Sequence, residues 1–391
     1  MTNSINVALV GSKFMGRAHS NAWLNVAKFF DVDPRPVMHT VVGRNADELN
    51  DFAQRWGWAN PTTETVAAIT ADEIGLVDIA TPNHIHAEHA IAALEAGKHV
   101  VCEKPLAGTL ADAEAMADAA AAASGSTFVW YNYRRVPAVA LAHRIVAGGA
   151  LGRIYHVRAC YLQSWGGPDT PLVWRFQGDV AGSGAHGDLN AHIIDAVRFV
   201  TGEEITSVEG SIEHTFIEER ALADGGGSEI AGSGAASTGA TGKSTVDDAV
   251  MFLARLSGGG LASFEATRLA TGYHNANRFE IHGERGALRF DFERMNELAF
   301  YDATAEATAG WTTIDVTRGG DGHPYADAWW PDSHGLGYEH SFVNQAADIL
   351  TMIGGGQPLV PMPDFADALA TQRVLDAAIV SARERSPVDL G

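Results

Sequence analysis

INVALVGSKFMG, residues 5–16, joins an apolar strand to a turn that carries two glycines. Gly11 and Gly16 have the spacing of the first and last glycines of G-x-G-x-x-G, the turn that leads from a strand into a helix in dinucleotide-binding domains. Lys13 occupies the place of the middle glycine, where the backbone usually approaches a pyrophosphate. The motif indicates a dinucleotide-binding turn, although a simple strand–helix turn would also explain it.

Strand and helix patterns alternate from this turn to about residue 135. The expected strands are 5–10, 37–42, 76–80, 99–102 and 127–131, and the expected helices are 14–30, 46–56, 86–96 and 110–123. These strands are short and continuously apolar, which is typical of a parallel sheet covered on both faces. We therefore predict an N-terminal Rossmann domain over residues 1–135.

Beyond about residue 150, strands with alternating apolar and polar residues are separated by tight turns. They are expected at 153–162, 208–216, 250–256, 261–266, 278–282 and 288–292, with helices at 188–200, 338–352 and 364–383. The fold class is thus α/β, with residues 136–391 forming an α+β domain around a large, mostly antiparallel, open-faced sheet. The last helix is placed to pack back on the first domain. Residues 222–245, rich in Gly, Ser, Ala and Thr, are expected to form a flexible loop.

Composition excludes several classes of protein. The formal charge of −21 argues against binding to nucleic acids or to anionic membranes, because both favour basic surfaces. Cys102 and Cys160 are the only cysteines, so neither a disulfide framework nor a cysteine-rich zinc site is expected. No long apolar stretch follows a basic N-terminus, so we expect no signal peptide, no membrane span and a cytoplasmic protein.

Polar loops follow the carboxyl ends of the second and third strands, the edge at which α/β proteins bind ligands. In Gly43-Arg44-Asn45, the arginine favours a 2′-phosphate and Asn45 can bond a ribose hydroxyl, but an ordinary solvated loop fits equally well. Residues 81–89, TPNHIHAEH, contain three histidines without an acid or cysteine cluster. We therefore expect helix caps or cofactor contacts there and no metal site.

Glu103-Lys104-Pro105 ends the fourth strand at the same edge. Pro105 restricts the conformation of the residue before it and thereby helps to fix the direction of Lys104. The lysine is either an ordinary surface residue in a turn or a group that the chemistry of this edge requires.

A second polar constellation lies on the expected helix 188–200. Asp188, His192 and Asp195 are spaced i, i+4, i+7, so they share one stripe beside the apolar stripe of the helix, and the first two can interact directly. A carboxylate beside an imidazole orients the ring and raises its basicity, as a general base requires. The alternative is a solvated helix face with a capping aspartate.

These motifs together resemble the Gfo/Idh/MocA family of oxidoreductases across nearly the whole chain. The residues that carry the resemblance are Gly11 to Gly16 followed by His19, Thr81-Pro82-Asn83, Glu103-Lys104-Pro105, Trp174-Arg175, and Asp188-x-x-x-His192-x-x-Asp195. The stretches YNYRRVPA, residues 131–138, and YLQSW, residues 161–165, are similar to the levoglucosan dehydrogenase branch, to which the inositol dehydrogenases are related. Lys13 and Arg44 depart from the family pattern.

The resemblance implies hydride transfer from a secondary hydroxyl, at C3 of a pyranose, anhydrosugar or glycoside, to NAD, with NADP as the alternative cofactor. The catalytic residues it implies are Lys104, Asp188 and His192. The cofactor-binding residues are Gly11, Ser12, Lys13, Phe14, Met15, Gly43, Arg44, Asn45, Ala80, Thr81, Pro82, Asn83, His86, Glu103, Lys104, Asn132 and Arg175. The substrate-binding residues are Lys104, Tyr133, Arg134, Gln163, Trp165, Trp174, Arg175, Asp188 and His192.

Several alternatives stay open at this point. An inositol dehydrogenase would use the same residues on a cyclitol, and a glycoside hydrolase of the same superfamily would use a tightly held NAD for transient oxidation and elimination. A nucleotide-sensing protein would bind the cofactor without turnover. Trp165 and Trp174 stack on sugar faces or belong to the core, although Trp165 is expected in an exposed loop. The open sheet face predicts a homodimer or homotetramer, in which the Trp329-Trp330 segment reaches a neighbouring site.

Overall fold

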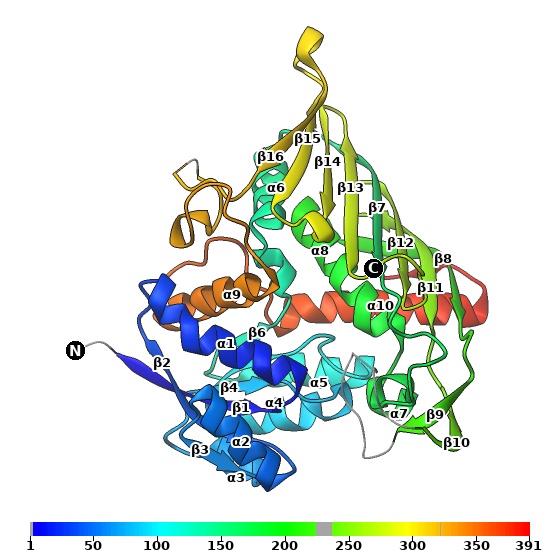
Figure 1. The fold of residues 1–391 in the computed structure, drawn as a ribbon. Coiled ribbons are helices and arrows are strands. Elements are labelled where there is room, and N and C mark those ends of the chain that lie inside the picture. The colour runs from blue at the N-terminus through cyan, green and yellow to red at the C-terminus, as the bar shows by residue number, and fades with distance from the viewer. Residues whose placement is uncertain (1–2, 224–236, 321) are drawn as a thin grey trace. The chain divides into compact units, whose positions relative to one another are not determined.

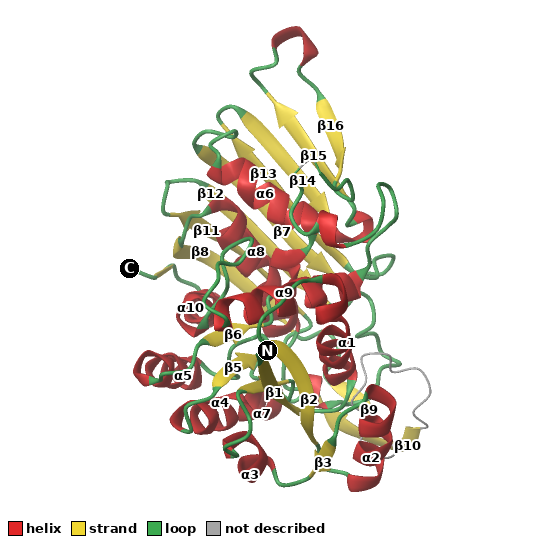
Figure 2. Ribbon diagram, turned by 90° about the vertical axis from the view of Figure 1, so that its left-hand side faces the viewer, coloured by secondary structure: helices red, strands yellow, loops and turns green. Residues whose placement is uncertain are grey.

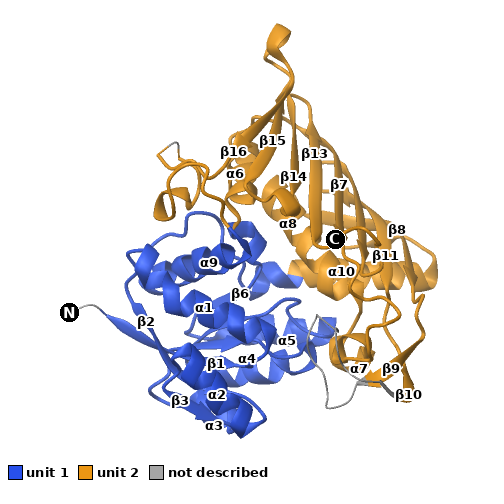
Figure 3. Cartoon of the chain, in the orientation of Figure 1, with its two compact units in different colours: residues 1–135, 337–369 blue, residues 136–336, 370–391 orange. Residues whose placement is uncertain are grey.

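The computed structural model describes residues 3–223, 237–320 and 322–391 (Figure 1). The chain divides into two compact units, residues 1–135 with 337–369 and residues 136–336 with 370–391 (Figure 3). The sequence placed residues 337–369 in the second domain, whereas they group with the first unit in the structure.

The first unit contains a six-stranded parallel sheet in the order β3-β2-β1-β4-β5-β6, which confirms the predicted Rossmann sheet. Its strands are β1 (Ser4–Val10), β2 (Arg35–Val42), β3 (Asn60–Thr62), β4 (Leu76–Ile79), β5 (His99–Cys102) and β6 (Thr127–Val129). The helices between them are α1 (Phe14–Phe29), α2 (Ala46–Trp56), α3 (Thr65–Thr70), α4 (His86–Glu95) and α5 (Leu110–Ala122). β3 and α3 were not expected, because Asn-Pro-Thr and six helical residues give too little periodicity to read.

The order of the strands sets where a ligand can bind in this unit. The order in which strands are added to the sheet reverses between β1 and β4, and open α/β sheets bind ligands at the carboxyl ends of the strands at such a point. The loops that follow β1, β4 and β5 begin at Gly11, Ala80 and Glu103, and these strands are neighbours in the sheet. Three of the expected site segments therefore meet at one edge.

Helix α9 (Tyr338–Ile353) belongs to this first unit although it lies more than 200 residues further along the chain. It packs against α1, with the Phe14 and Tyr338 rings stacked at 6.3 Å. Its Asn344 and Gln345 amides donate to the carbonyls of Arg135 and Val129. These long-range bonds explain why the boundary at residues 136–391 failed for this helix.

The second unit is built on a nine-stranded mixed sheet in the order β16-β15-β14-β13-β7-β12-β11-β8-β17 (Figure 2). Its strands are β7 (Ile154–Leu162), β8 (Ile205–His214), β11 (Ala249–Leu256), β12 (Leu261–Thr267), β13 (Ala276–Gly283), β14 (Gly286–Asp291), β15 (Glu297–Asp302), β16 (Trp311–Asp315) and β17 (Val388–Asp389). All neighbours are antiparallel except β7 and β12, which confirms the predicted mostly antiparallel sheet. Helices α6 (Pro137–Ala147) and α8 (Ala191–Thr201) pack on one face.

Alternation along the strands separates the two faces of this sheet. On β11, Val250, Phe252, Ala254 and Leu256 are buried, whereas Met251 and Leu253 are 48% and 59% exposed. Phe252 stacks on Phe264 of β12 with ring centroids 4.6 Å apart on the inner face. Burial of the Val250, Phe252 and Leu256 side chains contributes about 1.5–3 kcal/mol each through the hydrophobic effect.

The expected loop 222–245 is partly wrong. Strands β9 (Glu219–Ala223) and β10 (Ser237–Lys243) pair antiparallel and occupy its two ends, while residues 224–236 lie outside the described residues. β10 forms a strand although it is rich in Gly, Ser and Thr, because pairing needs only backbone groups, and the Leu172 N–H donates to the Ala221 carbonyl of β9 to extend the pairing.

In the part of the chain that the structure describes, no helix is both long enough and apolar enough to cross a membrane. Helix α10 (Phe365–Glu384) contributes its first turn to the first unit and its remaining turns to the second, where Thr371 accepts a hydrogen bond from Arg198 of α8.

Candidate active site

The turn after β1 is shaped for close backbone approach. Gly11 has φ of +114°, and a Cβ there would lie 2.5 Å from the carbonyl oxygen of Ala80. A Cβ at Gly16 would lie 2.2 Å from the carbonyl oxygen of Gly11. Neither position tolerates a side chain, so the turn packs directly on the residue that follows β4, and the first turn of α1 packs directly on Gly11.

The residues of this turn fit a dinucleotide pyrophosphate. Helix α1 begins at Phe14, and its N-cap residue Lys13 makes no side-chain cap bond to the first amides. A helix N-terminus with available N–H groups favours an anion. On the neighbouring loop, the hydroxyl oxygen of Thr81 is buried without a hydrogen-bond partner, which points to a ligand there.

Lys13, the departure from the glycine motif, is neutralised within the protein. Its ammonium lies 2.5 Å from the Glu48 carboxylate in the first turn of α2, and this hydrogen bond lowers the pKa of Glu48. The side-chain oxygen of Asn45 accepts from the Asp47 and Glu48 N–H groups, so Asn45 caps α2. The cap occupies the oxygen that was expected on a ribose hydroxyl, and Arg44 beside it is exposed.

A buried ionic network lies beneath Glu103 and Lys104. His19 of α1 donates from Nδ1 to Asp78 Oδ1 at 3.0 Å and from Nε2 to Glu103 Oε1 at 3.1 Å. The indole N–H groups of Trp23 and Trp130 also donate to Asp78. Burial lowers the pKa of His19, but the two carboxylates outweigh it and raise that pKa to about 9. His19 is therefore an imidazolium at neutral pH.

This network fixes the backbone at Lys104. The second oxygen of Glu103, Oε2, accepts the Lys104 N–H at 3.0 Å. Lys104 is half-buried between buried neighbours on either side. The sequence predicted Lys104 as a site residue. It also included His19 in the family motif, but only the contacts show that His19 supports Lys104 through Glu103.

His86 braces two loops instead of capping a helix. Its Nε2 lies 2.9 Å from the Thr81 carbonyl, and its Nδ1 lies 3.2 Å from the carbonyls of Pro105 and Leu106. Burial lowers the pKa of His86. Among the described residues, no group of three His, Cys, Asp or Glu side chains could hold a metal ion.

The remaining site residues of this unit are packed by α9 and α10. Asn132 donates to the Ser341 hydroxyl at 2.8 Å, the Tyr133 ring meets Tyr338 edge-on at 6.5 Å, and Arg134 pairs with Asp367. All three predicted residues lie in the short buried helix η2 (Asn132–Arg135). The ion pair gives Arg134 a structural role that the sequence did not show.

The segment expected as one helix over 188–200 begins differently. Residues His186–Asn190 form a π-helical turn, and α8 follows from Ala191. Asp247 shapes the turn by accepting the N–H groups of Gly184 and His186 at 2.7 and 2.8 Å. His192 is 8% exposed and Asp195 2%, so the alternative of a solvated helix face is wrong.

Asp188 has a partner that the sequence did not suggest. The guanidinium of Arg268, which follows β12, donates to Asp188 Oδ2 at 2.9 Å. Arg268 is 80 residues further along the chain and stands in no recognisable motif, so no local pattern signals the pair.

A chain of polar side chains lies near His192. The rings of His192 and Tyr161 are 5.8 Å apart. Tyr161 and Gln163 both donate to Asn275 Oδ1, at 2.6 and 2.8 Å, and the Trp165 N–H donates to Gln163 Oε1 at 2.6 Å. Gln163 and Trp165 were expected in the site, whereas Asn275 was missed because a single Asn in a turn carries no signal.

Trp165 is less exposed than predicted. It is half-buried against the cluster of Val173, Phe176 and Val246, and only Pro168 and Asp169 of its loop are exposed. The Arg175 guanidinium lies 4.4 Å from the Trp174 ring in the short helix η3 (Trp174–Phe176). Trp165 thus packs partly in the core. The rest of its ring is available for the stacking on a sugar that was the other expectation.

Comparison with known proteins decides the family. Residues 5–131 match the oxidoreductase family with an NAD-binding Rossmann fold, and residues 139–289 match the GFO/IDH/MocA C-terminal domain. Levoglucosan dehydrogenase of Pseudarthrobacter phenanthrenivorans is 41% identical over 391 residues, which cover 99% of this chain and 98% of that protein. The chain belongs to the Gfo/Idh/MocA family.

Solved structures of the family agree with this assignment. A levoglucosan dehydrogenase in complex with NADH and levoglucosan is 40% identical, covers 100% of both chains and has a TM-score of 0.91. An oxidoreductase domain protein from Kribbella flavida is 47% identical with the same coverage and TM-score. The protein is therefore an NAD-binding oxidoreductase of the Gfo/Idh/MocA family, as the sequence motifs predicted.

We predict that the stability of the protein depends on the protonation of His19. Because the folded chain holds this proton more tightly than the unfolded chain, the stabilisation is complete below pH 6.5 and is lost as pH rises through about 9. Urea unfolding of the wild type should show a decline on the order of 3 kcal/mol across this range. His19→Gln should be less stable at pH 7 and should lack this component of the decline; equal slopes for both proteins would contradict the assignment.

We also predict that Glu48 acts against NADP. Removing this carboxylate frees the Lys13 ammonium and leaves it and Arg44 to attract a 2′-phosphate, so Glu48→Gln should tighten NADPH binding by about fivefold. NADH affinity should change much less. The dissociation constants of both reduced cofactors can be measured by fluorescence titration, with Glu64→Gln as an exposed control; an unchanged NADPH-to-NADH ratio would rule out this role.

Proposed function

We propose that this protein is an NAD-dependent dehydrogenase that oxidises a secondary hydroxyl of an anhydrosugar or related pyranose, with levoglucosan as the first candidate substrate. The observation that carries the proposal is the similarity to levoglucosan dehydrogenase over the full length of both chains. It is supported by the polar chain of Tyr161, Gln163 and Asn275 beside His192, which offers the hydroxyl and amide groups that sugar recognition uses.

In this proposal Lys104 and His192 keep the catalytic roles that the family resemblance implies. The His192 imidazole accepts the hydroxyl proton, and the Asp188 carboxylate favours the charged ring that results. The Lys104 ammonium stabilises the oxygen as negative charge develops on it, an electrostatic effect that is often the largest part of catalysis. The position of Lys104 is held by the Glu103 carboxylate through the backbone N–H.

The chain also provides residues that fit the nicotinamide cofactor. Gly11 and the N-terminus of α1 would hold the pyrophosphate, and Thr81 offers a buried hydroxyl beside it. When bound, NAD supplies the acceptor for the hydride that leaves the sugar carbon. The protein's own contribution is to hold the hydroxyl carbon against the cofactor and to remove the proton.

The test of this function is a substrate panel with spectrophotometric detection of NADH. Levoglucosan, methyl glucosides, glucose and myo-inositol would each be offered with NAD and with NADP. We expect stoichiometric NADH from levoglucosan or a close pyranose. Preference for myo-inositol would favour an inositol dehydrogenase, and aglycone release from a nitrophenyl glycoside without net NADH would favour the glycoside hydrolase.

Loss of the Lys104 ammonium should lower turnover far more than binding. We expect Lys104→Ala to reduce kcat by about 10²–10⁴-fold, the range for a positioned acid, base or oxyanion partner. Lys28→Ala, which removes an exposed ammonium from α1, should have little effect. Steady-state kinetics at saturating NAD provide the measurement, and full activity of Lys104→Ala would exclude the proposed role.

We further propose that the outer face of the nine-stranded sheet pairs with a second copy of the chain. Ile212 and Met251 are cross-strand neighbours on β8 and β11, and with Leu253 they form an exposed apolar surface. Arg255 and Glu209, an ion pair on the same strands, provide polar groups of the kind found at the rim of an interface.

The expected assembly is a dimer or tetramer that Leu253→Glu breaks. Light scattering after size exclusion should give a multiple of the 41.4 kDa chain for the wild type and a shift towards the single chain for the variant. Val66→Glu, at an exposed apolar residue of α3 in the first unit, should leave the mass unchanged. A wild type of 41.4 kDa would refute the pairing.

A further inference from the structure

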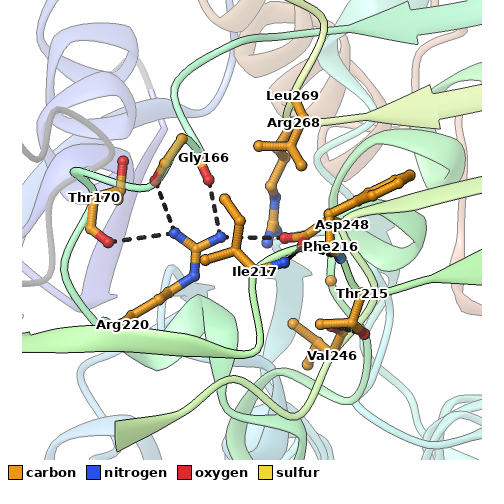
Figure 4. Close-up of polar contacts among 12 residues, drawn as sticks. Gly166, Thr170, Thr215, Phe216, Ile217, Arg220, Val246, Asp248, Arg268 and Leu269 are labelled. Atoms are coloured by element: carbon orange, nitrogen blue, oxygen red, sulfur yellow. Dashed lines mark hydrogen bonds and ion pairs between the residues drawn. The ribbon is translucent and has the colours of Figure 1, made fainter. Parts of the chain in front are cut away.

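Arg220 and Arg268 lie near Asp248 in the second unit (Figure 4), and Arg268 is also paired with Asp188. Arg220, Arg268 and Asp248 are at most 1% exposed. The fourth member, Asp188, is 23% exposed at its side chain. Charges as deeply buried as these persist only when each is paired, so the pattern of pairs indicates what each group does.

Arg220 and Asp248 form the structural half of this cluster. Arg220 donates to the carbonyls of Gly166, Gly167 and Thr170 and to Asp248 Oδ1, at 2.8 to 3.3 Å. The other oxygen of Asp248 accepts the N–H groups of residues 216–217 at 2.8 and 2.9 Å (Figure 4). Asp248 therefore neutralises the charge of Arg220 and holds the backbone at residues 216–217.

Arg268 forms the other half and reaches the site itself. One terminal nitrogen donates to Asp188 Oδ2 at 2.9 Å, and the other donates to the Arg175 carbonyl at 3.1 Å. The guanidinium lies 4.9 Å from the Trp165 ring centroid and 5.6 Å from that of Phe176. The Arg268 carbonyl accepts the N–H of Gly166, the residue after Trp165.

The contacts of Arg268 join the three segments that the proposed function assigns to the sugar. They are the loop around Trp165, the short helix with Arg175, and the π-helical turn with Asp188. Each segment comes from a different part of the chain, and each contains at most a short helical turn. The Arg268 guanidinium contacts all three, because its planar fork donates in two directions while its faces stack on aromatic rings.

We propose that Arg268 is the positioning residue of the sugar-binding half of the site, holding Asp188 ionised and aligned for His192 while it braces the Trp165 loop. The inference rests on the proposed function and adds to it a residue that touches neither hydride donor nor acceptor. The neighbouring cation favours the carboxylate form of Asp188, and the fixed geometry spares the entropy of orienting that group during the reaction.

The two roles of Arg268 make different demands on the side chain. Keeping Asp188 charged requires only a cation, whereas bracing Arg175 and Trp165 requires the planar guanidinium. Lysine should therefore restore turnover but not sugar affinity. A residue whose importance was only structural would lose or regain both together.

The test is a double-mutant cycle between Arg268 and Asp188 with kcat and KM for the sugar as readouts. Arg268→Met should lower kcat by about 30-fold, since a 1 Å displacement of a catalytic group costs up to about 10²-fold. In the Asp188→Asn background the same change should lower kcat by less than about threefold, because the group through which Arg268 acts is already lost. Arg268→Lys should recover most of kcat while the KM for sugar stays raised about tenfold.

Arg220→Lys is the matched control, because Arg220 is equally buried but is paired with Asp248. Arg220→Lys should lower the melting temperature. If it also lowers kcat, the double variant with Asp188→Asn should show the product of the two single losses, because the two residues act independently. Circular dichroism establishes that each variant is folded; if Arg268→Met does not fold, Arg268→Gln, which removes the charge but keeps a polar side chain, replaces it in the same cycle with Asp188→Asn.

The outcomes separate this inference from the proposed function. Two results would overturn the role of Arg268 and leave the proposed function intact. In the first, the wild type is active but the kcat losses of the Arg268 and Asp188 variants multiply. In the second, the Arg220 variant couples to Asp188 as strongly as the Arg268 variant does. A wild type inactive on every sugar and polyol of the panel overturns the proposed function and the role of Arg268 with it. Coupling confined to Arg268, with the split between kcat and KM in Arg268→Lys, supports the proposal.

Discussion

The imidazolium of His19 is held between Asp78 of β4 and Glu103 at the end of β5, and the cofactor side of the molecule depends on this arrangement. Two buried carboxylates on adjacent strands repel each other unless a cation lies between them. His19 supplies that cation from α1, the helix that also receives the glycine turn. One contact thus ties the turn, the central strands and the backbone of Lys104 into a single rigid unit.

The second unit uses the same principle with arginine in place of histidine. Arg220 of β9 and Arg268, which follows β12, are buried, and each is paired with one aspartate. Arg220 donates to the Thr170 carbonyl and Arg268 to the Arg175 carbonyl, so the guanidinium groups hold loop and short-helix backbone that no strand ladder fixes. A site assembled from loops needs such supports, because loops lack the backbone bonds that make helices and strands rigid.

The predictions from sequence succeeded where a pattern is local. Gly11 and Gly16 mark close approaches that exclude any side chain, and residue spacing alone gave the parallel sheet and the open-faced sheet. They failed where the deciding partner is distant. The π-helical turn at Asp188 is held by Asp247, and α9 is held in the first unit by its packing on α1 and by amides that donate to the carbonyls of Val129 and Arg135.

By itself the sequence provided the candidate catalytic residues and the order of the elements that present them. Lys104 follows a buried strand, Asp188 and His192 lie one helical turn apart, and both facts follow from short-range geometry. Only the tertiary structure decided which charges support them: His19 beneath Glu103, Arg268 beside Asp188, and Asn275 beside Gln163. Pairing of buried charges is a long-range requirement, satisfied by whichever residue the fold brings close, and such partners have no fixed spacing along the chain.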